Sequence, residues 1–399
     1  MPFIGSLSKS QSRLVDTVMV NTFLSETQNW LAPKIASAMT ATEKLHPIAF
    51  LGAVQGLRSL SKGMGKNTLA EYGFSVPIQT LGTAVGIKRD DVVFDQTGSV
   101  VGLKNAGSIA QKLATRLAST PDQVLCYRLL SGATLASCSD SFEGKSYPLT
   151  FDGLRFFDNA HPTAVGTTQS NNIAGALPVD LSSNPTIATL ALAFQSDMSK
   201  IIAYFKNVRD DQGYKLYPSF SPKEHLRIVV PTTLEQAATL AFTTGANAVI
   251  SQTSNITPLF VKEVISYGNL DSLQNPFGTA GATEVTPLNV TDYYCFIDGR
   301  ASQPLYMVNH APLMNPWGEV PSAEAIMGQF KELGANAFNA GALASTVIDS
   351  TFNKQGANAD AYTIMNQEFL ISPLWRGNVT YGNWMAACRV YPTGGTAQN

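Results

Sequence analysis

The chain has 399 residues, of which 44% are hydrophobic and only 14% are charged, and its net charge is −2 at pH 7. This composition excludes a disordered chain and a strongly basic nucleic-acid-binding domain. An ordinary soluble domain carries about 25% charged residues, so the shortfall indicates a large interior or much surface covered by partners.

The ends and the cysteines suggest a protein that stays in a reducing compartment. The amino terminus lacks a charged segment ahead of a long apolar run, which argues against a secretory signal, and no apolar run is long enough to predict a membrane span. The cysteines at positions 126, 138, 295 and 388 fit neither a metal knuckle nor a dense disulfide framework, so we expect buried thiols.

Residues 1–48 have no regular apolar periodicity of useful length, and we expect them to form an extended arm. Ordering such an arm costs entropy that its own contacts cannot offset, so it should be held by neighbouring subunits or by the chain's own long helix. The expected apolar anchors are Phe3, Ile4, Phe23, Trp30 and Leu31.

Residues 49–97 are rich in glycine and alternate apolar and polar side chains at Phe74, Val76 and Ile78. This pattern predicts a long β-hairpin, with Pro77 at an edge position. Because an isolated hairpin is only marginally stable, we expect residues 55–92 to reach over an adjacent subunit.

The clearest helix is predicted over about 102–118, where apolar residues recur at steps of three and four. These residues are Leu103, Ala106, Ala110, Leu113 and Leu117. The sequence Thr120-Pro121-Asp122-Gln123 then predicts a second helix start, with Thr120 as N-cap and Gln123 completing a capping box.

The rest of the chain predicts a mixed α+β core. TFDGLRFFDNAHP (150–162) indicates a strand and a turn; Asn184-Pro185 opens a helix with one apolar stripe; and Thr232 with Glu235 forms a capping box for another helix. Further strands are expected at 225–230, 259–266, 293–298, 304–309, 368–372 and 383–391.

Catalytic and metal sites have little support in the sequence. His161 follows Asp158 and could form a dyad, but the His-Pro step after Asp-Asn favours a structural turn, and no nucleophile elbow is present. The pairs Asp90-Asp91 and Asp210-Asp211 could bind a divalent cation, but adjacent aspartates on a strand point to opposite faces. A solvated turn or a salt bridge with Arg89 is the preferred interpretation. We therefore expect neither an enzyme nor a cofactor.

Five segments, in order, resemble the Mu-like bacteriophage major head subunit family. They are AFLGAVQGLRSL (49–60), YGFSVPIQTLGTAVGIKRDDVVFDQTG (72–98), GLRFFDNAHP (153–162), YYCFIDGRASQPLYMVN (293–309) and NQEFLISPLWRGNVTYGNWMAACRVY (366–391). Leu60 stands where the family has tryptophan, and residues 207–290 contain no matching motif.

The resemblance implies a Hong Kong 97-like capsid fold. Its parts would be an N-terminal arm (1–48), an extended hairpin loop (49–97), a peripheral domain with a long spine helix (98–180), an apical domain (181–345) and returning peripheral strands (346–399). The spine helix would cover 102–118 and could continue to 135.

The implied function is that of a tailed-phage major capsid protein, in a virion assembled in the bacterial cytoplasm. The chain would self-assemble as hexamers and pentamers into an icosahedral shell, with scaffold, portal and decoration proteins and with packaged double-stranded DNA bound without sequence specificity. Expected intersubunit contacts are Phe3, Phe23, Trp30, Arg58, Lys62, Lys66, Arg89, Asp90 and Asp91. Lys112 and Arg116 would face the lumen, although a solvated helix face explains them equally well. An encapsulin-like compartment and a soluble hydrolase are the alternatives.

Overall fold

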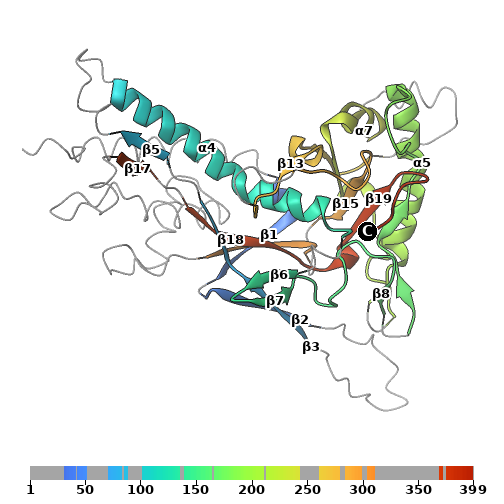
Figure 1. The fold of residues 1–399 in the computed structure, drawn as a ribbon. Helices are drawn as coiled ribbons and strands as arrows, with labels where there is room; N and C mark the ends of the chain where they lie inside the picture. Colours follow the sequence, from blue (N-terminus) through green and yellow to red (C-terminus); the bar gives the residue numbers. More distant parts are fainter. Residues whose placement is uncertain are drawn as a thin grey trace, which may run out of the picture.

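The computed structural model describes thirteen stretches of the chain. They are residues 31–41, 43–51, 71–82, 85–88, 101–134, 139–163, 166–210, 213–242, 260–278, 284–298, 303–310, 368–371 and 374–398. Helices and strands are mixed along the chain, which confirms the expected α+β class. The molecule is elongated, with helix α4 running from one end towards the centre (Figure 1).

A four-stranded sheet lies beneath α4, and its strands come from distant parts of the chain. Its order is β1 (Ala36–Ala41), β16 (Leu305–His310), β18 (Leu374–Tyr381) and β4 (Gln79–Gly82). The β1–β16 pair is parallel and the other two pairs are antiparallel. Since β1 belongs to this sheet, the expected arm is built into its own subunit from residue 36 onwards.

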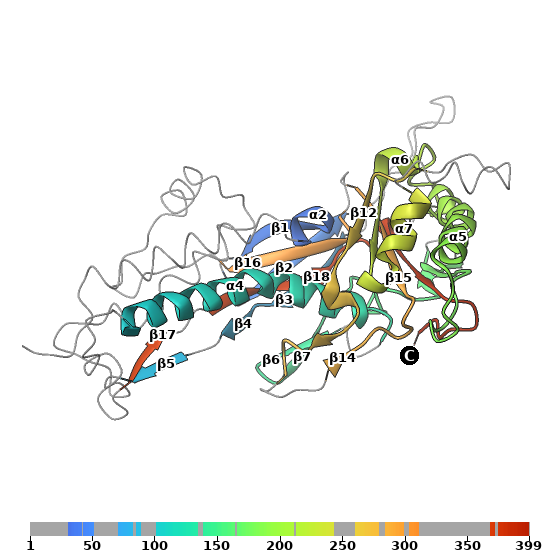
Figure 2. The same ribbon diagram turned by 90° about the horizontal axis from the view of Figure 1, so that it is seen from above.

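A five-stranded mixed sheet forms the other half of the molecule, visible in Figure 2 beside α5 and α7. Its order is β10 (Asn172–Ala174), β19 (Ala387–Tyr391), β15 (Tyr293–Ile297), β11 (Leu226–Val230) and β12 (Glu263–Ser266). Strands β10 and β19 come from outside the expected apical segment 181–345, and β16 from inside it joins the other sheet.

The five-stranded sheet is covered on both faces, so its central strand β15 is apolar throughout. Tyr293, Cys295 and Ile297 face a core shared with helices α5 (Ile187–Asn207) and α7 (Glu235–Phe242). Tyr294 and Phe296 face a second core, which contains the buried side of α4 and the four-stranded sheet. This sheet therefore joins the two halves of the molecule.

Helix α4 (Val101–Leu130) is one continuous helix of 30 residues, so the predicted second start at Thr120 is wrong. Pro121 lies inside the helix, and the Thr120 hydroxyl donates back to the Arg116 carbonyl at 2.9 Å instead of capping. Burial of the helix's second half explains this, because tertiary packing outweighs the local capping preference.

Two hairpins lie side by side next to the four-stranded sheet (Figure 1). Strand β2 (Leu45–Leu51) pairs with β3 (Glu71–Pro77), and β6 (Ser139–Phe142) pairs with β7 (Lys145–Pro148). A hairpin is therefore present, but its first strand begins at residue 45, ahead of the expected segments 49–97 and 55–92. Residues 79–82 and 85–88 of those segments pair with other parts of the chain. Its second strand packs partly against its own subunit, since Phe74 and Val76 are buried in the core.

Several short elements complete the described part of the chain, and none of its helices is long and apolar enough to span a membrane. The short strands pair as β5 (Val85–Lys88) with β17 (Glu368–Ile371), β8 (His161–Pro162) with β9 (Thr168–Gln169), and β13 (Leu273–Gln274) with β14 (Glu284–Val285). The short helices are α2 (Ala32–Ile35), α6 (Pro222–His225), η4 (Thr232–Leu234), η5 (Gly268–Leu270) and η8 (Trp384–Ala386).

The predicted helices and strands of the core are largely present, with local differences. Helix α5 buries the predicted stripe from Leu190 onwards, while its N-cap is Thr186. The predicted strand 150–162 is mostly turns, and the first part of 383–391 is the helix η8. Before α7, the backbone amides of Thr232 and Thr233 bond to the carboxylate of Asp271, which replaces the predicted capping box.

Candidate functional site

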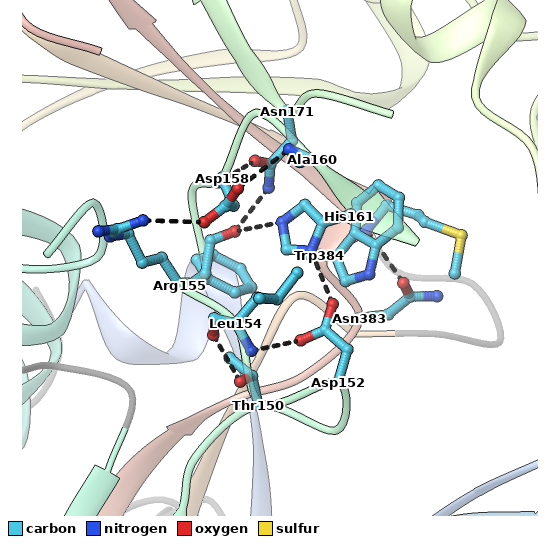
Figure 3. A network of polar contacts seen from close by, with 12 residues as sticks. Thr150, Asp152, Leu154, Arg155, Asp158, Ala160, His161, Asn171, Asn383 and Trp384 are labelled. Carbon is cyan, nitrogen blue, oxygen red and sulfur yellow. Dashed lines mark hydrogen bonds and ion pairs between the residues drawn. The ribbon is translucent and has the colours of Figure 1, made fainter. Parts of the chain in front are cut away.

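The loop that contains His161 is the only segment for which the sequence offered a catalytic interpretation. Polar contacts between its side chains and backbone hold it in shape (Figure 3). His161 is fully buried, and its Nδ1 lies 2.7 Å from Oδ2 of Asp152. The ring stacks on Trp384 with 4.1 Å between ring centroids. Its Nε2 faces the backbone carbonyl of Phe156 at 3.3 Å. Both ring nitrogens thus face acceptors, not a hydroxyl nucleophile.

The neighbouring Asp158 has a different partner from the one that the dyad hypothesis gave it. Its carboxylate accepts the Ala160 amide at 3.0 Å and pairs with Arg155 at 3.3 Å. Its backbone amide donates to Asn171, whose side-chain nitrogen donates in turn to the Phe156 carbonyl. These contacts hold a turn in shape, and they arrange no group for proton transfer to a substrate.

The aspartate pairs proposed as cation sites gain no support. Asp210 accepts the Tyr214 amide at 2.8 Å within a turn, and Asp90, Asp91 and Asp211 lie outside the described residues. Within the described stretches no three His, Cys, Asp or Glu side chains gather as metal ligands would.

Most of the expected contact residues lie outside the described part of the chain. These are Phe3, Ile4, Phe23, Trp30, Arg58, Lys62, Lys66, Arg89, Asp90 and Asp91. The other three residues are described: Lys112 and Arg116 are exposed on α4, and Leu31 is buried. The Leu31 amide is bonded to the chain's own long helix α4, one of the two partners expected for the arm.

The bond that holds the Leu31 amide is made by Asp122, for which the sequence predicted only a place in a capping box. The carboxylate of Asp122 accepts the Leu31 amide at 2.8 Å and the Ala32 amide at 2.9 Å. Amides at the start of a helix have no acceptor within the helix. Asp122 of α4 supplies one, and so caps α2, which lies about 90 positions earlier in the chain. Burial raises the pKa of Asp122 to about 6, against the opposing effect of these hydrogen bonds and one from Tyr267.

A second cluster joins α4 to the hairpins. The guanidinium of Arg128, 1% exposed, lies 2.6 Å from Oδ2 of Asp140 on β6. It also donates to the Val379 carbonyl at 3.0 Å and to Oδ1 of Asn378 at 3.1 Å. The Asn378 side-chain nitrogen then donates to Asp140 and to the Pro77 carbonyl, each at 2.8 Å.

A third cluster contains a buried ion pair and holds residues 396 and 397. Arg389 on β19 and Asp292 lie 2.6 Å apart, and each side chain is 1% exposed. Arg389 also donates to the backbone carbonyls of Thr396 and Ala397. In the sequence, the charged residues of these clusters stand next to apolar helix or strand positions, as Arg128 does beside Leu129. A charged residue within an apolar segment is the one sequence signal that could have indicated these clusters.

Residues 13–180 match the family model described as the Mu-like prophage major head subunit gpT. Over these residues, fewer than half of the chain, the sequence is similar to the Mu-like major head subunit family. The matched segment contains β1, the β2–β3 hairpin, α4 and the His161 loop. The family is described as a subunit of the phage head.

Solved structures that resemble this chain include phage capsids. They are the capsid of bacteriophage JBD30 (17% identity, TM-score 0.41, covering 59% of this chain and 89% of that one) and the capsid of cyanophage P-SCSP1u (12%, 0.48, 91% and 88%). A virus-like particle from Pyrococcus furiosus is also similar (9%, 0.42, 94% and 98%). With TM-scores below 0.5, these likenesses are loose. No curated protein matches the chain.

Proposed function

We propose that this chain is the major capsid protein of a tailed bacteriophage, and that its copies assemble into the icosahedral head shell around double-stranded DNA. The observation that carries this proposal is the match of residues 13–180 to the major head subunit family. A shell subunit acts through the surface it buries against its copies, and its interfaces close around rotation axes. The low charged fraction of 14% suits a chain with much covered surface.

The proposed subunit has the parts of a Hong Kong 97-type capsid protein. In this assignment α4 is the spine helix, the β2–β3 hairpin is the base of the extended loop over 49–97, and residues 1–48 contain the arm. The five-stranded sheet with α5 and α7 is the centre of the apical domain. This division is supported by the length of α4 and by the two separate hydrophobic cores.

The proposed partners follow from the shell. They are further copies of the chain in hexamers and pentamers, scaffold and portal proteins, a decoration protein, and DNA bound without sequence specificity. Lys112 and Arg116 would face the lumen, where two exposed cations contribute weak, salt-dependent attraction to phosphate. The proposed location is the virion, after assembly in the host cytoplasm.

Electron microscopy of the full-length chain after expression in bacteria tests the proposal. Closed shells of uniform diameter are expected, and heads from the source particle should contain DNA. Shells filled with protein cargo would favour the encapsulin-like alternative. A monomer that turns over an ester or peptide substrate would favour the hydrolase and refute the proposal. A deletion of residues 2–30 should leave a folded core that assembles poorly or into aberrant particles.

A further inference from the structure

The chain changes sheets at Pro77 and Ile78. Strand β3 ends at Pro77 and pairs with β2, whereas β4 begins at Gln79 and pairs with β18 of the four-stranded sheet. The direction of the β2–β3 hairpin relative to the four-stranded sheet therefore depends on how these two residues are held. The Ile78 amide bonds to the Lys44 carbonyl at 2.8 Å, which closes the base of the hairpin itself.

One side chain of the subunit body holds this turning point. Asn378 on β18 is fully buried, and its side-chain nitrogen donates to the Pro77 carbonyl at 2.8 Å. Its orientation is fixed from both sides, because its oxygen accepts from Arg128 while its nitrogen also donates to Asp140. Asp140 lies on β6, and the β6–β7 hairpin packs against β3. The spine helix, the four-stranded sheet and both hairpins thus meet at three side chains.

Stability alone does not explain this cluster. Replacing a buried ion pair by apolar side chains of similar volume is often neutral or stabilising, because desolvation of the charges offsets their attraction. What the pair adds is direction: a guanidinium and an amide accept only a few geometries around one carboxylate. A cluster that fixes geometry at the base of the β2–β3 hairpin is suited to setting the hairpin's angle.

We propose that Arg128, Asp140 and Asn378 form a positioning site that sets the direction of the β2–β3 hairpin, and thereby the contacts that the subunit makes with its neighbours. This inference rests on the proposed shell function. It assigns the three side chains no contact with a neighbour; they act through Pro77 and β6.

The experiment measures the hairpin's direction in the full-length chain by spin labelling. Labels at Ala49→Cys on β2 and Gln111→Cys on α4, both exposed positions, report the hairpin relative to the spine helix. A pair at Gln111→Cys and Ser196→Cys on α5 reports the body alone. All pairs are made in a Cys138→Ser background, and labelled chains are diluted with unlabelled ones.

Two variants disturb the cluster and one is a matched control. Arg128→Met with Asp140→Leu removes both charges, and Asn378→Ala cuts the bond to Pro77. Arg389→Met with Asp292→Leu removes an equally buried pair that touches neither hairpin. The first two should shift or broaden the Ala49–Gln111 distance distribution and cause loss of shells of normal diameter. The control should leave that distribution unchanged, and the Gln111–Ser196 distance should stay constant in all of them.

If the paired variant does not fold, Arg128→Lys takes its place. Arg128 uses two nitrogens of its planar guanidinium to reach Val379, Asp140 and Asn378, and the single nitrogen of an ammonium lacks that fixed geometry. An unchanged Ala49–Gln111 distribution in folded variants would overturn the inference. A changed distribution with normal shells would overturn its link to assembly. A wild-type chain that forms no shells would instead refute the proposed function, while the distance measurement would still decide the positioning role.

Discussion

Asp122 accepts the backbone amide of Leu31 across 91 positions of the sequence. Because this carboxylate is buried with a pKa of about 6, against 3.8 in the unfolded chain, the folded chain holds its proton more tightly. Between pH 4 and 6 the unfolding free energy should therefore fall as pH rises. The fall attributable to this group is up to about 3 kcal/mol, at 1.36 kcal/mol per pKa unit.

Urea unfolding of the wild type and of Asp122→Asn at pH 4, 5, 6 and 7 checks this prediction. The variant lacks the titration of Asp122, so its stability should fall less steeply with pH in this window. Asp197, whose pKa burial also raises to about 6, contributes to the slope of both chains. Asp180→Asn is the control, because Asp180 is exposed and its pKa is lowered by hydrogen bonds to Ser182. Identical slopes in the wild type and Asp122→Asn would contradict the prediction.

Replacing His161 by alanine should destabilise the subunit without affecting any catalysis. The change opens a cavity against Trp384 and leaves the Asp152 carboxylate, 5% exposed, without its partner. Such a loss costs about 3–5 kcal/mol, measurable by chemical unfolding. His225→Ala, which removes a partly buried ring bonded to Ser221, should cost about 1 kcal/mol. An enzymatic turnover of the wild type that vanishes in His161→Ala would count against a purely structural role.

Thr120→Ala should leave stability within about 0.5 kcal/mol of the wild type, because Thr120 lies inside a continuous helix and caps nothing. If the predicted capping box were correct, the same change would cost about 1 kcal/mol. Thermal unfolding separates these outcomes, and Thr186→Ala, which removes the N-cap of α5, gives the size of a true capping loss.

Gly382→Ala should destabilise the subunit by about 3 kcal/mol or more, through overpacking. An added Cβ would overlap the Gln303 carbonyl oxygen and lie 2.9 Å from the Tyr306 ring, where the chain crosses between the two sheets. Gly73→Ala is the matched control, since its Cβ would meet the Ile48 carbonyl oxygen at an ordinary 3.7 Å. Equal unfolding midpoints for the two variants would show that the crossing is not tightly packed.

The sequence predicted those parts of the fold that depend on local spacing. The stripe of α5 and the apolar run of β15 appear as expected, because burial of one helix face or of both strand faces is encoded within a few residues. The start assigned to Thr120 failed because a threonine hydroxyl can also donate back along a helix, and only distant packing decides which bond forms.

The clusters at the candidate site could not be predicted from spacing. Arg128 bonds Asn378 across 250 positions, and Asp122 bonds Leu31 across 91. A charged residue in an apolar stripe indicates that some partner exists, yet nothing local identifies it. For the same reason, residues 36–41 are expected from the sequence to belong to an extended arm, whereas in the structure they form β1 and pair with β16.

The strands β18 and β19 lie inside their sheets, and each is synthesised after every strand with which it pairs. Strand β18 joins β4 to β16, and β19 joins β10 to β15. A chain still growing on the ribosome therefore cannot complete either sheet, and its unpaired edges stay open until residue 391 has emerged. Completion of both sheets thus waits for these two strands, and chains that stop before them lack the finished surfaces on which one copy could join another.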